Sequence, residues 1–165
     1  PLGVLKLPVP LKDGYNRRMK LIELIEKPLW TITGKCAKDT LIPDLISICK
    51  VNGQHQFIIF DAKYYNAHLE TGIAPTGQPG IESVTKQYLY QLAYQKFIED
   101  HNFSSVKNCF LLPTENNEIE DKGEVRMEML SNLGLQDIKG RLIPATMAYD
   151  LYLSGRKMDI ADLEL

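Results

Sequence analysis

The chain has 165 residues, 44% of them hydrophobic and 24% charged, which is the composition of one globular domain large enough to bury a core. It contains no apolar run of membrane-spanning length and no secretory signal pattern, and its three cysteines lack the CxxC spacing of a zinc site, so we expect a cytoplasmic protein. The net charge of −2 argues against a protein that holds nucleic acid by charge alone.

Positive charge is concentrated at the N-terminal end. Residues 1–40 carry eight Lys or Arg against four acids, whereas residues 115–165 carry six against eleven. This is either uneven solvated surface or a chain with one end that faces phosphates. The first three residues, Pro1-Leu2-Gly3, have the look of a cleaved tag, so we expect a fragment of a larger protein with a single domain over residues 4–165.

An amphipathic helix is predicted over residues 16–27, after an extended, proline-rich lead-in. Its apolar residues recur on one stripe, as in a helix that packs against a core. Glu23 and Glu26 also lie on this helix. They are either ligands of a bound cation or, with Lys20 and Lys27 nearby, part of a solvated face.

Two strand-like runs follow, residues 41–51 and 57–60, with Asn52-Gly53 between them. Asn-Gly is the strongest short signal for a β-hairpin, because both residues tolerate the positive φ of a two-residue turn. The second run is buried in character and is broken by Asp61 and Lys63, which a strand points to the same face.

The register of this hairpin decides where three ionisable side chains lie. With a two-residue turn, Val51 pairs with Gln54. Asp44 then lies opposite Asp61, whereas a four-residue loop sets it opposite Lys63. In both registers the three side chains share one face of the sheet, because cross-strand partners point to the same side. Only a loop of odd length separates them.

Such a cluster suits a divalent cation. Two carboxylates about 4 Å apart repel by roughly 4 kcal/mol at an effective dielectric near 20, so the pair is a liability to folding unless a cation compensates it. Oxygen-only ligands favour Mg²⁺, which commonly takes one or two carboxylates together with substrate phosphate. A cation held by Asp44 and Asp61 would polarise a phosphodiester and activate a water, while Lys63 would stabilise the developing charge. We therefore predict phosphodiester hydrolysis.

The remaining elements complete an α/β pattern. Residues 66–80 hold three glycines and two prolines and form either a substrate-facing flap or a plain connector. A helix is predicted over residues 82–101, on which Gln87, Gln91 and Tyr94 form a stripe that faces either the site or solvent. Further on we expect strands at 106–113, 124–130 and 138–143, an acidic loop at 114–122, a helix at 145–153 and a peripheral acidic end at 159–165. Together these elements predict a mixed central β-sheet flanked by helices.

An acid-x-Lys triplet occurs three times, at Asp61-Ala62-Lys63, Glu120-Asp121-Lys122 and Asp137-Ile138-Lys139. Only the first triplet ends a buried apolar run and has a Pro-Asp on the strand predicted to pair with it. We therefore take Asp61-Ala62-Lys63 as the candidate site. Pro43-Asp44, sixteen intervening residues and then Asp61-x-Lys63 resembles the signature of the PD-(D/E)XK nucleases.

More narrowly, three segments are similar to the nuclease subunit of LlaJI-type restriction systems, which are related to McrC. The segments are residues 60–65, 86–94 and 108–113, and the resemblance covers residues 40–155. It implies a PD-(D/E)XK restriction-endonuclease-like core and a Mg²⁺-dependent endonuclease for double-stranded DNA, with Mn²⁺ able to substitute. It also implies an AAA+ GTPase motor subunit of the McrB type as partner. The chain would then be the C-terminal part of a larger restriction subunit.

The motif also implies roles for individual residues. Asp44, Asp61 and the backbone carbonyl of Ala62 would be metal ligands, and Lys63 the catalytic lysine. The relatives often carry a QxxxY motif on the helix after the lysine strand. Here the spacing differs, because each glutamine of the stripe is followed by a tyrosine three residues on, so the resemblance does not choose between Gln87 and Gln91 as the catalytic glutamine.

An interpretation from a different class is a non-catalytic DNA- or partner-binding module that kept the fold. In that case Asp44, Asp61 and Lys63 form a structural ion cluster. All three residue types are intact, which counts against this interpretation, since a degenerate site needs none of them.

Overall fold

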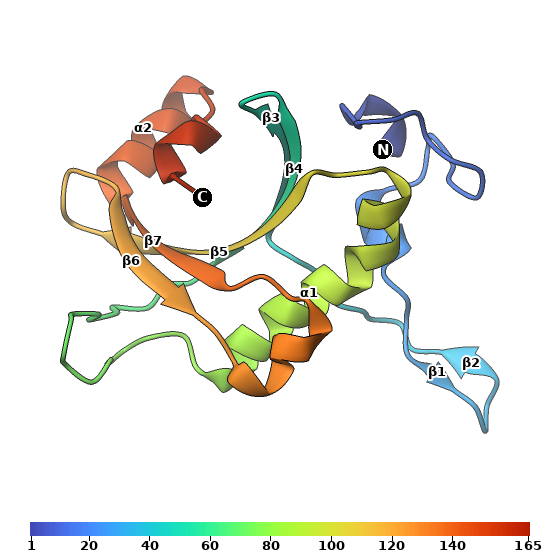
Figure 1. Cartoon of the computed structure of the whole chain (residues 1–165), viewed down its shortest axis with the longest axis horizontal. Coiled ribbons are helices and arrows are strands. Elements are labelled where there is room, and N and C mark those ends of the chain that lie inside the picture. The colour runs from blue at the N-terminus through green and yellow to red at the C-terminus, as the bar shows by residue number, and fades with distance from the viewer.

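A computed structural model describes all residues, 1–165. Its centre is a five-stranded sheet in the order β3-β4-β5-β7-β6, with helix α1 on one face and helix α2 with the C-terminal segment on the other (Figure 1). The elements are β1 Leu29–Trp30, β2 Lys35–Cys36, β3 Leu45–Val51, β4 Gln54–Ala62, α1 Ile81–Asp100, β5 Ser105–Thr114, β6 Glu120–Val125, β7 Ile138–Pro144 and α2 Ala145–Ser154. No helix combines the length and the apolar character needed to cross a bilayer. The expected mixed α/β fold is confirmed.

Strand β4 is buried on both faces, which is why its sequence contains a continuous apolar run. It pairs with β3 in antiparallel and with β5 in parallel orientation, and β5 pairs in parallel with β7. Phe57 and Ile59 pack in the same cluster as Tyr90 and Phe97 of α1. Their neighbours in the sequence belong to a second cluster on the opposite face. The next residue on the α1 face is therefore Asp61.

The predicted helix over residues 16–27 is wrong. A single turn of 3-10 helix is present, at Leu21–Leu24. The carbonyls of Arg17 and Met19 accept hydrogen bonds from Gly3 and Leu2 at 2.8 and 2.7 Å, so they do not serve an α-helical ladder. Leu2 is 1% exposed and lies in the core cluster of the α1 face, so the N-terminal residues we had set apart take part in the packing.

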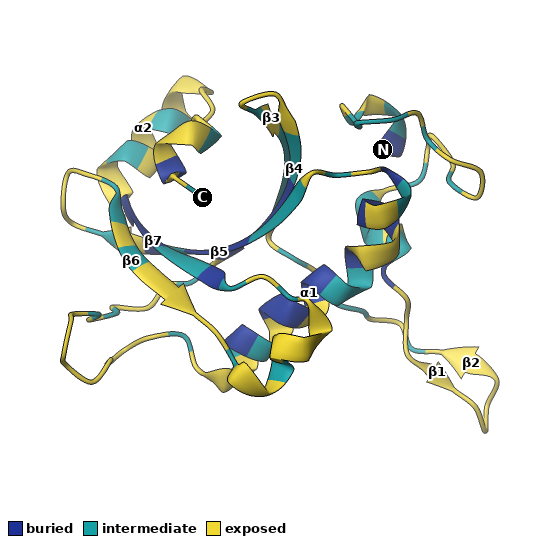
Figure 2. Cartoon of the chain, in the orientation of Figure 1, coloured by how far each residue is buried: buried dark blue, intermediate teal, exposed yellow.

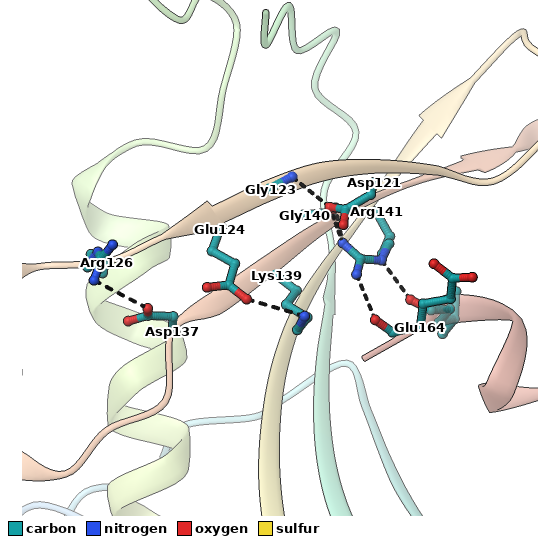
Figure 3. Close-up of polar contacts among 10 residues, drawn as sticks. Asp121, Gly123, Glu124, Arg126, Asp137, Lys139, Gly140, Arg141 and Glu164 are labelled. Carbon is teal, nitrogen blue, oxygen red and sulfur yellow. Dashed lines mark hydrogen bonds and ion pairs between the residues drawn. The ribbon is translucent and has the colours of Figure 1, made fainter. Parts of the chain in front are cut away.

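The acidic segment after β5 also differs from the expectation. We predicted a loop at 114–122 and a strand at 124–130, but β6 covers Glu120–Val125, and a 3-10 helix follows at Glu128–Leu133. Two of the three acids of β6 face bases on the neighbouring strand, with Glu124 at 3.2 Å from the Lys139 ammonium (Figure 3). Cross-strand pairing of opposite charges stabilises this edge, so a charged sequence forms a strand.

The C-terminal end is not peripheral, contrary to our expectation. The Arg141 side chain is 2% exposed and donates from Nε to the carbonyl of Leu163 at 2.6 Å and from an amino group to that of Glu164 at 2.9 Å (Figure 3). Arg141 also forms an ion pair with Asp121 of β6. The last residues are thereby attached to the sheet, and Leu163 packs in the core of that face.

Candidate active site at the end of strand β4

The two-residue turn brings distant carboxylates together. Asn52 and Gly53 have φ values of 50° and 82°, as a two-residue hairpin turn of the I′ type requires. Val51 pairs with Gln54, and the register continues to Leu45 opposite Phe60. One further step in this register sets Asp44 opposite Asp61. The hairpin predicted from the sequence is confirmed.

Asp44 lies at the entrance to β3 and is exposed at the surface. Its Oδ2 accepts a hydrogen bond of 2.9 Å from the backbone N–H of Ala62. This bond connects the start of β3 to the end of β4 and holds the Asp44 carboxyl next to that of Asp61. The Asp44 carboxyl also contributes to the raised pKa of Asp61, as expected for two acids at one site.

Asp61 is 1% exposed, and its pKa is raised, first by burial and then by the neighbouring Asp44. The Lys63 ammonium touches its Oδ2 and offsets part of this rise. The contact lacks the alignment of a hydrogen bond, so Oδ2 is a buried oxygen without an aligned donor. Because a buried carboxylate normally has all its oxygens paired, an oxygen that has an ammonium contact but no aligned donor is a candidate ligand for a cation.

Helix α1 adds two residues that the sequence analysis missed. The Tyr90 hydroxyl donates to the carbonyl of Ile42 at 2.7 Å and so fixes the segment that leads into Asp44. The Lys86 ammonium lies 5.6 Å from the centre of the Tyr90 ring. Its pKa is raised, first by Tyr90 and further by the negative charges of Asp61 and Asp44. The i, i+4 spacing of Lys86 and Tyr90 predicts only that the two side chains are neighbours on the helix, and it does not place them at the site.

Two of the three glutamines of α1, Gln87 and Gln91, lie on the sheet side, where both form a side-chain hydrogen bond with Asn108. Gln87 is completely buried and donates from Nε2 to the carbonyl of Ile59 at 2.8 Å, while its Oε1 has no partner. The Oε1 of Gln91 accepts from the Asn108 amide at 2.7 Å and from the N–H of Gln136 at 3.0 Å. Gln91 therefore attaches the segment before β7 to the helix. Gln87 contacts strand β4, which carries Asp61.

Neither glutamate proposed as a further ligand joins the site. The carboxylate of Glu23 accepts from the N–H of Lys20 at 2.8 Å and caps its own 3-10 helix. Glu26 is exposed, and its backbone carbonyl accepts from Thr40. No cluster of three or more His, Cys, Asp or Glu side chains suited to a metal ion is present in the chain.

The donor set at this corner fits Mg²⁺. It consists of oxygen atoms only, with two carboxylates, one of which has a buried oxygen without an aligned donor. Two protein carboxylates with water and substrate oxygens filling the other positions is the usual arrangement for this ion, which rarely has an all-protein cage. Asp44 and Asp61 would hold the ion, with the Ala62 carbonyl as a further candidate ligand.

Two hollows lie beyond the carboxyl ends of the central strands. One of about 680 Å³ is bounded by the 64–70 segment and by residues after β5. The other, of about 440 Å³, is largely apolar and has Lys63 and Ala62 on its wall. Segment 66–80 contains no helix or long strand, in agreement with the predicted loop, and a single bridge joins His68 to Thr76. Open space therefore lies directly beside Lys63, and neither Asp44 nor Asp61 lines these two hollows.

Comparison with known proteins gives one family and one relative. The model of the family described as LlaJI restriction endonuclease matches residues 15–151. Over 158 residues the chain is 32% identical to the Type II restriction enzyme BsuMI component YdjA of Bacillus subtilis strain 168, and the match covers 92% of this chain. The chain spans about a third of the length of that curated relative, 32%. No solved structure matches.

Proposed function

Because the chain belongs to the LlaJI restriction endonuclease family, we propose that it is the metal-dependent nuclease domain of a restriction system. Its substrate is double-stranded DNA, and its cofactor is Mg²⁺, for which Mn²⁺ substitutes. One observation carries the proposal: Asp44, Asp61 and Lys63, far apart in the chain, meet in one corner where an Asp61 oxygen has no aligned donor. This is the arrangement expected of a PD-(D/E)XK site.

Each residue has a defined part in phosphodiester hydrolysis. A divalent cation supplies Lewis acidity toward the phosphate and toward the attacking water. Asp44 and Asp61 bind and orient that cation through their carboxylates. Lys63 stabilises negative charge as it develops on the phosphoryl oxygens, and its contact with Asp61 keeps the ammonium aimed at the same corner.

Three residues of helix α1 support this centre. Tyr90 holds the carbonyl of Ile42 and thereby positions Asp44 two residues on. Gln87, with one unpartnered buried carbonyl oxygen next to the strand of Asp61, is the better candidate for the catalytic glutamine than Gln91, whose oxygen is already used twice. Lys86 supplies a second positive charge for phosphate.

The partners follow from the family and the relative. The relative is named as a component of a restriction enzyme, which supports the assembly of this chain with other subunits. We propose an AAA+ GTPase of the McrB type as the motor subunit, and the cytoplasm as the location.

The experiment is cleavage of supercoiled plasmid in Mg²⁺ or Mn²⁺, with the wild type and Lys63→Ala compared. We expect nicked and linear products from the wild type and a loss of at least about 100-fold in the variant, the usual effect of removing a group that stabilises transition-state charge. Lys122→Ala is the matched control, because Lys122 also follows an acid by two residues and pairs with it, at 3.0 Å from Glu120.

Cleavage at equal rates by the wild type and Lys63→Ala would refute the assignment of Lys63. Plasmid that stays supercoiled with every metal ion, also after addition of the other subunits of the system, would favour the non-catalytic binding module instead.

A further inference from the structure

A short hairpin projects from the body of the molecule (Figure 1). We name residues 27–38, which contain β1 and β2, the β1–β2 arm. Its strands pair only with each other and form a separate two-stranded sheet. The arm is closed by backbone hydrogen bonds from Ala37 to Pro28 at 2.7 Å and from Gly34 to Trp30 at 2.9 Å. An isolated hairpin of this size is marginally stable in water, so a folded arm with no cover gains from a partner.

The arm presents large apolar side chains to solvent. All residues from position 26 to position 36 are exposed, as the colouring of β1 and β2 shows (Figure 2). Trp30 is 64% exposed and Ile32 is 95% exposed, with Leu29 at 59%. A tryptophan and an isoleucine near the tip of a projecting hairpin leave a concentrated apolar surface without a neighbour, which is typical of an interaction site.

The charge of the arm identifies the class of partner. It contains Lys27, Lys35 and Lys38 and no acid, although the whole chain has a net charge of −2. Lys35 pairs with Trp30 near the apolar tip, and Lys27 and Lys38 lie at the base of the arm, next to Glu26 and Asp39. An apolar tip with an ammonium beside it and two more at its base complements a polyanion with an apolar interior, which describes a DNA duplex. A two-stranded ribbon fits a groove, and apolar side chains of groove-binding proteins insert between base steps.

The base of the arm is fixed close to the candidate active site. The Thr40 hydroxyl donates to the carbonyl of Glu26 at 2.7 Å, and Tyr90 holds Ile42. Thr40 precedes Asp44 by only four positions, which limits their distance to about 14 Å. The arm itself adds roughly another 14 Å to its tip. A DNA duplex bound at Asp44 and Asp61 would therefore extend to the tip of the arm within about one turn of the double helix, roughly 34 Å.

We propose that the β1–β2 arm is a second DNA-binding element, which inserts Trp30 and Ile32 into a groove beside the cleavage site while its lysines contact the flanking phosphates. The inference rests on the proposed function insofar as DNA is the substrate. It adds an element outside the Asp-Asp-Lys site that determines affinity and the position of the cut.

The single tryptophan of the chain makes the arm directly observable, because all tryptophan fluorescence comes from Trp30. In Lys63→Ala, which keeps DNA intact, we expect a duplex of about three helical turns to quench this emission and to protect Trp30 from acrylamide. Binding is measured in parallel by the anisotropy of labelled DNA. We expect Ile32→Ser to weaken binding by about tenfold. Leu153→Ser, 67% exposed on α2, is the matched control and should bind as before.

The lysines are tested by the salt dependence of binding. Replacement of Lys27, Lys35 and Lys38 by Ala should lower the slope of log Kobs against log salt by about 2 to 3, since each phosphate contact contributes roughly 0.9. Three alanines at other exposed lysines, Lys50, Lys96 and Lys157, provide the control for loss of general charge.

The inference would be overturned if DNA binds while the emission and the acrylamide accessibility of Trp30 stay unchanged. It would also be overturned if the chain binds no duplex. A Trp30 response that depends on protein concentration without DNA would also overturn it, because the arm would then be a contact between copies of the chain. If the wild type cleaves DNA but the Trp30 emission does not respond to DNA, the proposed role of the arm is wrong and the proposed nuclease function stands. Quenching by DNA in a chain that never cuts contradicts the proposed function and supports the arm.

Discussion

Replacement of Asp61 by Asn should make the metal-free protein more stable. Asp61 is 1% exposed, its Oδ2 has no aligned donor, and the neighbouring Asp44 carboxyl adds to the rise that burial causes in its pKa. An unsatisfied buried polar group costs about 1–3 kcal/mol. The substitution would remove one of two neighbouring negative charges and keep the shape of the side chain, so we expect a gain of about 1–2 kcal/mol. For a domain of this size that raises Tm by about 2–8 °C.

The pH dependence of stability checks independently whether Asp61→Asn stabilises the protein. Because burial raises the pKa of Asp61, the folded state binds this proton more tightly than the unfolded chain does. The resulting stabilisation is complete below the unfolded pKa of about 3.9 and is lost as the pH rises through the higher value of the folded protein. The advantage of Asp61→Asn over the wild type should therefore be largest near neutral pH and should shrink toward pH 4.

Mg²⁺ should remove most of this difference in stability. Binding to the folded state alone stabilises it by about 1.4 kcal/mol at ten times the Kd, which corresponds to a rise of roughly 3–6 °C in Tm. Thermal unfolding followed by circular dichroism in EDTA and in Mg²⁺ measures both effects. The wild type should gain from Mg²⁺ and Asp61→Asn should not, with Asp150→Asn, an exposed position on α2, as the control.

Two results would refute the reasoning. A lower Tm of Asp61→Asn in EDTA would show that the Asp61 carboxylate is a structural partner of Lys63, because the charge would then stabilise the fold. An equal gain from Mg²⁺ in the wild type and in Asp61→Asn would show that the cation binds elsewhere.

Two further variants test the supports of the site and of the sheet. Tyr90→Phe removes the 2.7 Å bond to Ile42 and should cost about 1 kcal/mol in urea unfolding; since it acts through Asp44, it should also raise the Mg²⁺ concentration for half-maximal cleavage, which a purely structural defect would leave unchanged. Arg141→Met leaves the carbonyls of Leu163 and Glu164 without their donor and the exposed Asp121 carboxylate without its ion-pair partner, so we expect a loss of about 1–3 kcal/mol and faster proteolysis of the C-terminal end. A C-terminal end that stays resistant in Arg141→Met would contradict this role of the guanidinium.

The parts of the structure that local rules determine could be predicted from the sequence. Asn52-Gly53 fixed the turn type, and with it the register that sets Asp44 beside Asp61. The buried apolar run became β4, and the long periodic segment became α1 within one residue of the expected bounds. In each case the signal and its cause lie within a few neighbouring residues.

The wrong predictions have a different cause, because contacts with residues distant in the chain determine the structure of these segments. Residues 16–27 have a helical pattern, but residues 2 and 3 take the carbonyls of Arg17 and Met19. The acidic β6 is a strand because Arg141 and Lys139 lie opposite its acids. Lys86 and Tyr90 gained their place at the site from the packing of α1 against β4, which no local pattern displays.

The sheet order also explains how a chain with a net charge of −2 can bind a polyanion. Strand β3, which follows the basic arm and Asp44, and strand β6, which carries the acids, form opposite edges of the sheet. At the β6 edge, Asp121 and Glu124 are paired with Arg141 and Lys139, which limits the negative field there. Charges of exposed groups are screened beyond about 8 Å at physiological ionic strength. DNA bound at the β3 edge, as proposed, would therefore meet the local lysines and not the net charge, so total charge alone does not argue against the proposed function.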